Sequence, residues 1–322
     1  MFNKTLKKTL VDNGNKMLIF KRIKEQKQLH LMLLPGIIFL ILFNYLPMIG
    51  MIMGFQDFKP FKGFLGSEFV GLKHFIALGK DLLFWRAFRN SLVMSLIKLV
   101  ITFPIPIFFA IILNELRNGF YKKIVQTASL LPHFIAWVVI AGIFQIWLSD
   151  DGLVNVILAK MHIITKPYAF LQEKQSFWVL MAIIDAWKST GWWSVIYLAS
   201  IAGISIEVYE AALIDGAGRI KRILFITLPY LKNTMAIVFI LSMGGLVAGG
   251  MNGTNFTQSL LFSNVMNYDY SLVLDTYVVR LGLQLGRLSF AAAVGIVLSV
   301  VSLVLFTGTN YISKKINGTS IY

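Results

Sequence analysis

Cysteine is absent from this sequence of 322 residues, which excludes disulfides, zinc–thiolate sites and thiol nucleophiles. The four histidines (His30, His74, His133 and His162) are scattered, with no pair at metal-binding spacing. The chain also lacks the phosphate-binding pattern G-x-x-x-x-G-K-S/T, so it cannot hydrolyse ATP through such a loop. No Ser-His-Asp set stands out either. We therefore predict no catalytic residue and no metal site in this chain.

Charged residues are also scarce. They form 14% of the chain against 57% hydrophobic residues, and the mean hydropathy is +0.72. This composition is too apolar for a soluble domain of this length and indicates a polytopic helical membrane protein with one membrane domain. In a soluble chain, the net charge of +15 would suggest a nucleic-acid partner. Here much of the positive charge flanks apolar runs, where it sets topology and meets anionic membrane lipid, so we expect no nucleic acid.

Six apolar runs predict six membrane-spanning helices. Their approximate bounds are Leu29–Met53, Asn90–Leu113, Ile124–Leu148, Phe177–Ile201, Thr234–Ala248 (continuing into a glycine-rich stretch) and Leu288–Tyr311. An even number of spans puts both termini on one side, and the basic turn at 114–123 marks that side as cytoplasmic. The segments 54–89, 149–176 and 254–287 are then external loops, the last with a possible re-entrant piece.

Three parts follow from this layout: a basic cytoplasmic segment at 1–28, a single transmembrane domain at 29–312 and a cytoplasmic tail at 313–322. A signal peptide is the alternative for the first part. The apolar run that follows it is too long for one, however, and no A-x-A-like site comes after it. The external loop at 54–89 holds six lysines and arginines, so it violates the positive-inside rule locally.

The most informative polar stretch lies between the fourth and fifth spans, at 207–233. Residues 210–217 predict a short helix that ends at Gly216, a residue suited to the left-handed conformation that terminates helices. A second helix at 219–227 is expected to run into Leu228 and Pro229. Two short helices joined at a glycine make a compact knob between membrane spans, which suits docking to a partner.

The pattern E-A-A-x-x-D-G-A followed by I-x-L-P resembles the coupling loop of permease subunits of binding-protein-dependent ABC importers. The alternative is an ordinary polar loop. At Ile220 and Ile223 the chain departs from the aromatic residues that this family often has. In the family the loop, here 205–233, sits in a cleft of a cytoplasmic ATPase. The resemblance assigns that role to Glu210, Ala211, Ala212, Asp215, Gly216, Ala217, Arg219, Ile226, Leu228 and Pro229.

Further segments resemble the carbohydrate permeases that take up polysaccharides and complex oligosaccharides, namely FVGLKHF, VQTASLLPHFIAWVV, DAWKSTGW and DTYVVRLGL. This resemblance implies the six-helix type I importer permease fold in the bacterial cytoplasmic membrane. It also implies a second, homologous permease subunit, two cytoplasmic ATP-binding subunits that hold ATP and Mg, and an extracellular substrate-binding protein that delivers an oligosaccharide. It implies no cofactor in this chain. A permease for an amino acid or phosphonate, and a non-transport membrane protein, are the alternatives.

Polar and aromatic residues near the middle of the fourth span and after the fifth are candidates for the substrate path. Sugars are usually bound by aromatic faces and hydrogen-bonding groups together. Asp185 and Lys188 lie three residues apart on one helix face and can pair. The alternative is that these two charges only neutralise each other while the tryptophans pack. The candidates are Asp185, Trp187, Lys188, Thr190, Trp192, Asn252 and Asn255.

Overall fold

The computed structural model describes residues 26–116, 119–173, 176–318 and 320–321, and within them it is helical apart from one short hairpin. Almost all of the predicted basic segment at 1–28 lies outside the described residues. Four helical runs are long and apolar enough to cross a membrane: Lys27–Phe55, Leu82–Glu115, Arg219–Gly244 and Leu288–Ile316. Two bent helix pairs in the described residues bring the number of candidate spans to six.

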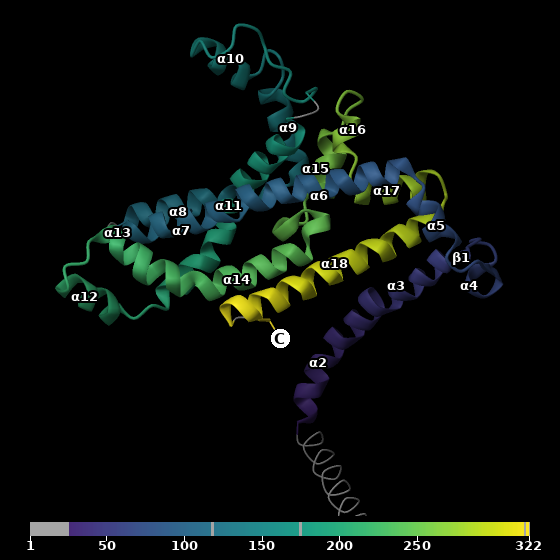
Figure 1. Cartoon of the computed structure of the whole chain (residues 1–322), viewed down its shortest axis with the longest axis horizontal. Coiled ribbons are helices and arrows are strands. Elements are labelled where there is room, and N and C mark those ends of the chain that lie inside the picture. Colours follow the sequence, from purple (N-terminus) through teal and green to yellow (C-terminus); the bar gives the residue numbers. More distant parts are fainter. Residues whose placement is uncertain (1–25, 117–118, 174–175, 319, 322) are drawn as a thin grey trace, which may run out of the picture.

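The first span is a segmented helix that touches the rest of the chain only near its end. It consists of α2 (Lys27–Leu40), a π turn (Ile41–Tyr45), α3 (Leu46–Met48) and a 3-10 helix (Ile49–Phe55). Figure 1 shows α2 leaving the helical body, and no residue of its most apolar window is buried. The 3-10 helix packs against α18 (Leu288–Asn317), and a Cβ on Gly54 would lie only 2.9 Å from Ile296 Cδ1. The span therefore carries an apolar surface that this chain leaves uncovered.

The second span begins at Leu82 rather than at the predicted Asn90. Asp81 is its N-cap, and its Oδ1 accepts hydrogen bonds from the amides of Leu83 (2.8 Å) and Phe84 (3.4 Å). Helix α6 (Leu82–Thr102) is followed by α7 (Pro104–Glu115), so the expected interruption by proline is confirmed. A proline at the first position of a helix lacks only an N–H that would have no partner there.

The third span is not the single helix predicted over Ile124–Leu148. Helices α8 (Gly119–Phe134) and α9 (Trp137–Trp147) meet at an angle of 99°, and α10 (Leu153–Lys160) follows. The fourth span, α11 (Phe177–Ala202), agrees with its prediction within one residue.

The fifth span is longer than predicted because it incorporates the helix predicted at 219–227. Helix α13 (Arg219–Arg222), a π turn (Ile223–Thr227) and α14 (Leu228–Gly244) form one apolar run of 26 residues. The expectation of a separate helix at 219–227 and a span that begins only near Thr234 is therefore wrong. A proline ring clashes with the carbonyl four residues before it, and the wider π turn that precedes Pro229 accommodates this misfit.

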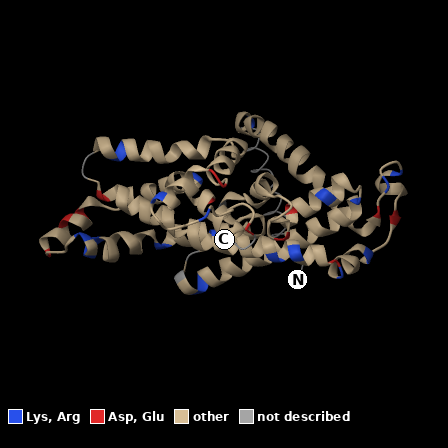
Figure 2. Cartoon of the chain, turned by 90° about the horizontal axis from the view of Figure 1, so that it is seen from above, with Lys and Arg blue, Asp and Glu red and all other residues tan. Residues whose placement is uncertain are grey.

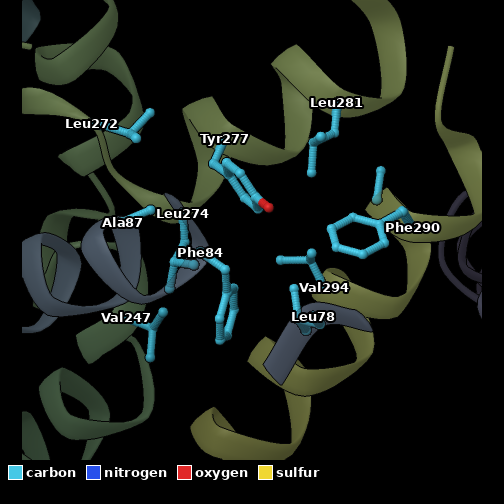
Figure 3. Packing of buried hydrophobic residues seen from close by; sticks show 11 residues of the cluster. Leu78, Phe84, Ala87, Val247, Leu272, Leu274, Tyr277, Leu281, Phe290 and Val294 are labelled. Carbon is cyan, nitrogen blue, oxygen red and sulfur yellow. The ribbon is translucent and has the colours of Figure 1, made fainter. Parts of the chain in front are cut away.

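The segments predicted as external loops 54–89 and 254–287 are largely helical and pack on each other. The first contains strands β1 (Gln56–Asp57) and β2 (Glu68–Phe69), which pair antiparallel, and helices α4 (Gly63–Gly66) and α5 (Lys73–Gly79). The second contains α15 (Asn255–Phe262), α16 (Tyr268–Ser271), α17 (Leu274–Val279) and a π turn (Arg280–Gln284). Figure 3 shows the shared apolar core, in which Leu78 and Phe84 lie close to Tyr277 and Phe290. The Tyr277 hydroxyl also donates to Asp81 Oδ2 at 2.6 Å.

Two further apolar clusters join the remaining helices. One groups Met94, Ile140, Met181 and Ile184 from α6, α9 and α11. The other groups Ile107, Tyr197, Leu231 and Val238 from α7, α11 and α14. In Figure 2 most of the ribbon is uncharged, and residues of both signs are visible at the end that holds α12 (Ile206–Ile214) and at the opposite end near β1.

Candidate functional site

The glycine elbow of the predicted coupling loop is present and is built by backbone hydrogen bonds. Helix α12 starts at Ser205, whose side chain accepts from the amide of Glu207 at 3.3 Å. At its other end the amide of Ala217 donates to Ala212 O (2.8 Å) and that of Gly216 to Leu213 O (3.0 Å). This pair of bonds is the Schellman motif, and Gly216 has the left-handed φ of +73° that the motif requires.

Contacts with the membrane helices fix the position of this loop. Arg219 Nε lies 2.8 Å from Glu115 Oε2 at the end of α7, and the Tyr209 hydroxyl hydrogen-bonds with that of Thr227 at 2.8 Å. Glu210 is exposed and has no ion pair among the described residues, so it pairs with no cation of the second helix within this chain.

The surface of the loop is apolar as well as charged. Ile214, Ile220 and Phe225 expose 87%, 73% and 75% of their surface. Large aliphatic and aromatic side chains at this level of exposure, grouped on one projecting loop, are typical of an interaction site. The remaining predicted coupling residues lie in the same short segment, from Ala211 and Asp215 in and after α12 to Ile226 in the π turn and Leu228 at the start of α14.

Three of the predicted substrate-path residues meet in a buried polar network. Asp185 of α11 is 1% exposed, and its carboxylate accepts from Asn252 Nδ2 (2.9 Å) and Thr254 Oγ1 (3.1 Å). Lys98 of α6, also 1% exposed, donates to Thr254 Oγ1 (2.8 Å) and Asn255 Oδ1 (2.9 Å). The Thr254 hydroxyl therefore bridges the two opposite charges, so neither is buried without compensation.

The network also holds the irregular backbone between α14 and α15. Trp193 Nε1 donates to Asn252 Oδ1 at 2.6 Å, and Asn255 Nδ2 donates to Ser95 Oγ at 2.7 Å. Gly249 nearby has φ +113°, and a Cβ there would lie 2.8 Å from the amide nitrogen of Asn255. The polar side chains thus fix a tight backbone turn that only glycine fits.

The pairing of Lys188 with Asp185 that the helix spacing permits does not form. Lys188 Nζ instead donates to the carbonyls of Pro132 (3.0 Å), His133 (2.6 Å) and Ile135 (2.7 Å). These carbonyls lie where α8 ends and the chain turns into α9, so they lack the usual partner four residues on, although Pro132 O also accepts from the Ile135 amide at 3.2 Å. A lysine offers three donors, and the carbonyl end of a helix attracts a cation.

The other candidates on α11 lie around the same elbow or bond within their own helix. Trp192 stacks on the His133 ring, with centroids 4.4 Å apart, and Trp187 meets Phe144 edge to face. A Cβ on Gly191 would lie 2.1 Å from Ser129 O, so only glycine permits this approach of α11 to α8. Thr190 Oγ1 donates to Ala186 O at 2.6 Å, one turn earlier in α11.

Lys98 and Thr254 are the important residues that sequence reasoning did not assign. The sequence did contain a signal for Lys98, because it is the only charged residue in its predicted span. Asp185 is the only carboxylate in any of the six predicted spans, so the two residues could have been expected to compensate each other. Thr254 carries no such signal, since one hydroxyl after a glycine-rich stretch is unremarkable. Among the described residues no group of three His, Asp or Glu side chains could hold a metal ion.

Comparison with known proteins places this geometry in context. Residues 75–318 match the model of the family described as binding-protein-dependent transport system inner membrane component. The polygalacturonan/rhamnogalacturonan transport system permease protein YteP of Bacillus subtilis is 39% identical over 95% of this chain and 94% of its own length. Protein LplB of the same organism is 36% identical, over 93% of this chain and 92% of its own.

Solved structures show the same similarity in three dimensions. A chain of a bacterial ABC transporter involved in the import of the acidic polysaccharide alginate superimposes with a TM-score of 0.83 and 35% sequence identity, covering 93% of this chain and 99% of that one. A second structure, in complex with an alginate pentasaccharide-bound periplasmic protein, gives the same TM-score. The chain therefore belongs to the binding-protein-dependent transport system inner membrane components and has the membrane fold of an ABC importer permease.

Proposed function

We propose that this permease takes up an oligosaccharide delivered by an extracellular binding protein. The observation that carries the proposal is the alignment along nearly the whole chain with the alginate importer, whose structure includes a periplasmic protein loaded with a pentasaccharide. The relatives named for polygalacturonan and for arabinooligosaccharides support the same class of substrate. An amino-acid or phosphonate substrate has no comparable support among these relatives.

Two cytoplasmic ATP-binding subunits supply the energy in this proposal and bind ATP and Mg. The sequence has no nucleotide-binding loop of its own, so hydrolysis takes place on these partners. Residues 205–233 dock to them, since this loop projects exposed apolar side chains such as Ile214 and Phe225. ATP-driven closure of the two subunits moves the coupling loops together, and the membrane helices respond by opening the path to the other side.

A second, homologous permease subunit completes the membrane part. The apolar surface of α2 supports this, because a span with nothing buried against its own chain gains packing from a partner helix. We expect the two subunits to differ, forming a heterodimer, with the substrate path between them and lipid around them.

The complex is placed in the bacterial cytoplasmic membrane with both termini and the coupling loop inside. Arg219, Lys221 and Arg222 beside the loop, and Lys314 and Lys315 at the end of α18, support this orientation.

Reconstitution of the complete complex in vesicles tests the function. Both permeases, the ATPase and the binding protein are assembled, and ATP hydrolysis is measured with a panel of oligosaccharides, an amino-acid mixture and a phosphonate. We expect stimulation and uptake with at least one oligosaccharide. Stimulation by the amino acids or phosphonate alone would contradict the proposed substrate class, and no co-purifying ATPase would contradict the transport assembly.

A further inference from the structure

A cavity of about 360 Å³ lies between α15, α16, α17 and the π turn that follows α17. Figure 1 shows α17 and the coupling helix α12 at opposite ends of the molecule. The wall of the cavity combines two aromatic rings, hydroxyl groups, an amide and one guanidinium group. The residues concerned are Phe256, Tyr268, Ser259, Ser263, Gln284 and Arg280. Its volume is at the low end for ligand pockets, about 300–1,000 Å³, which suits part of a larger ligand.

Arg280 supplies the only charge among the described residues that line this cavity. Its Nη1 donates to the Tyr268 hydroxyl, and its guanidinium carbon lies 5.8 Å from the centroid of the Tyr268 ring. Both contacts orient the guanidinium group, but neither neutralises it. A guanidinium group has five N–H donors, so donors remain for a planar anion such as a carboxylate.

Three carboxylates near this end of the molecule are already engaged, whereas Asp275 of α17, which does not line the cavity, has no ion pair among the described residues. Lys73 Nζ lies 2.7 Å from Asp57 Oδ2, and this hydrogen bond lowers the pKa of Asp57 below its ordinary value. Asp269 pairs with Arg86 at 2.5 Å, and Asp81 accepts from Tyr277.

Unlike Arg86, three other arginines rest on aromatic rings here. Arg89 lies over Trp178 and Tyr270, and Arg287 lies over Phe290, in the same way that Arg280 lies over Tyr268. Arginines held on rings rather than by carboxylates keep their positive charge available to a ligand. The neighbouring segment 54–89 also holds more lysines and arginines than carboxylates, in conflict with the usual charge rule for external loops.

We propose that this cavity receives an acidic sugar residue, with Arg280 binding its carboxylate, and that the transporter prefers uronic-acid-containing oligosaccharides to neutral ones. Aromatic rings suit the apolar face of a sugar ring, and hydroxyl and amide groups suit its hydroxyls. Arg280 is the residue that selects a negatively charged sugar over a neutral one. The inference rests on the proposed function, because it specifies which oligosaccharides use the path.

The absence of cysteine allows a direct test in the assembled transporter. Gln284→Cys is introduced, and the rates of modification by an anionic and a cationic thiosulfonate reagent are compared. Adding Arg280→Gln should lower the anionic-to-cationic rate ratio by about fivefold or more, because the local positive potential is lost. Lys62→Gln, which removes a positive charge from the hairpin outside this cavity, is the matched control and should change the ratio by less than about twofold.

Ligand protection then identifies the occupant. Trigalacturonate should slow modification of Gln284→Cys, its carboxyl-reduced counterpart should not, and Arg280→Gln should weaken the protection by about tenfold or more, as expected for a charge-assisted hydrogen bond. Leu260→Cys, on the same wall, is a second reporter if Gln284→Cys does not assemble.

Three results would overturn the inference. They are equal protection by both sugars, unchanged rates in Arg280→Gln, and protection that depends on phosphatidylglycerol in the vesicles and not on trigalacturonate. If neutral oligosaccharides still stimulate ATP hydrolysis in that case, the proposed function stands and only the acidic specificity fails. If no oligosaccharide stimulates hydrolysis, the proposed function itself fails.

Discussion

Lys98 and Asp185 show how a membrane protein accommodates single charges in its interior. Each would be very costly to bury alone, and they come from different helices, α6 and α11. The Thr254 hydroxyl accepts from the lysine and donates to the carboxylate, so its single oxygen serves both. Because Thr254 follows the glycine-rich turn, the two charges also fix the position of the irregular backbone after α14.

Replacement of Lys98 should therefore destabilise the protein more than the loss of one contact suggests. Lys98→Met leaves the Asp185 carboxylate buried without its cation, a change that costs about 3–5 kcal/mol in buried pairs. We expect a clear loss of assembled complex and a lower melting temperature, measured by size-exclusion and thermal unfolding of the purified transporter.

A double variant separates the charge from the packing. Lys98→Met combined with Asp185→Asn should recover much of the lost stability, because no unpaired charge remains. Thr190→Ala is the matched control in the same helix, since the Thr190 hydroxyl bonds only within α11. A Lys98→Met complex as stable as the parent would refute the interpretation.

At the scale of elements, α11 connects two bends of different construction. At its middle, Lys188 binds the carbonyls released where α8 turns into α9. Beyond its end, the chain after α12, the proposed coupling helix, turns at Gly216 by a backbone motif that needs no side chain. The first bend depends on a contact between distant parts of the sequence, whereas the second is encoded within eight residues.

The Gly216 elbow has room for a larger side chain, but its left-handed backbone conformation is unfavourable for a β-branched residue. No atom of another residue lies within 4 Å of a Cβ built there, so the cost of Gly216→Val comes from φ alone. Left-handed backbone costs an L-residue about 1–2 kcal/mol, which corresponds to roughly a tenfold weaker docking conformation. We expect ATP hydrolysis stimulated by substrate to fall strongly while assembly of the complex persists. Gly216→Asn should restore much of the activity, because asparagine accepts this conformation; full coupling in Gly216→Val would contradict the role of the elbow.

The contrast between these bends explains what could be predicted from the sequence. The Gly216 turn and the bounds of α11 follow from local signals, namely a glycine after a helix-forming run and a long, mostly apolar stretch without proline. The bend after Pro132 could not be predicted, because proline only permits it and Lys188 stabilises it from more than fifty residues away. The pairing of Lys188 with Asp185 failed for the same reason: helix periodicity shows which residues share a face, but not the acceptors that a neighbouring helix offers.

At the scale of the whole molecule, the two ends have different surfaces. The coupling end projects exposed apolar residues among basic ones, and the opposite end carries the hairpin, α5 and the helices at 255–284 as one packed layer. Figure 1 shows these ends separated along the length of the long helices. Between them, α2 lies apart from the helical body and its apolar residues are uncovered. The uncovered apolar surface therefore lies along the side of the molecule rather than at its two ends.

This polarity gives a prediction about orientation in the membrane. Because basic residues retained near span ends favour the cytoplasmic side, the coupling loop should face inwards and the hairpin outwards, despite the lysines that the hairpin carries. Gly218→Cys and Leu65→Cys form a matched pair, since Gly218 lies beside the elbow, and Leu65 at the hairpin is fully exposed. In intact cells a membrane-impermeant thiol reagent should label Leu65→Cys and leave Gly218→Cys unmodified until the membrane is permeabilised. The reverse pattern would invert the orientation and remove residues 205–233 from contact with a cytoplasmic ATPase, whereas labelling of neither position before permeabilisation would show that the outer layer is covered in the assembled complex.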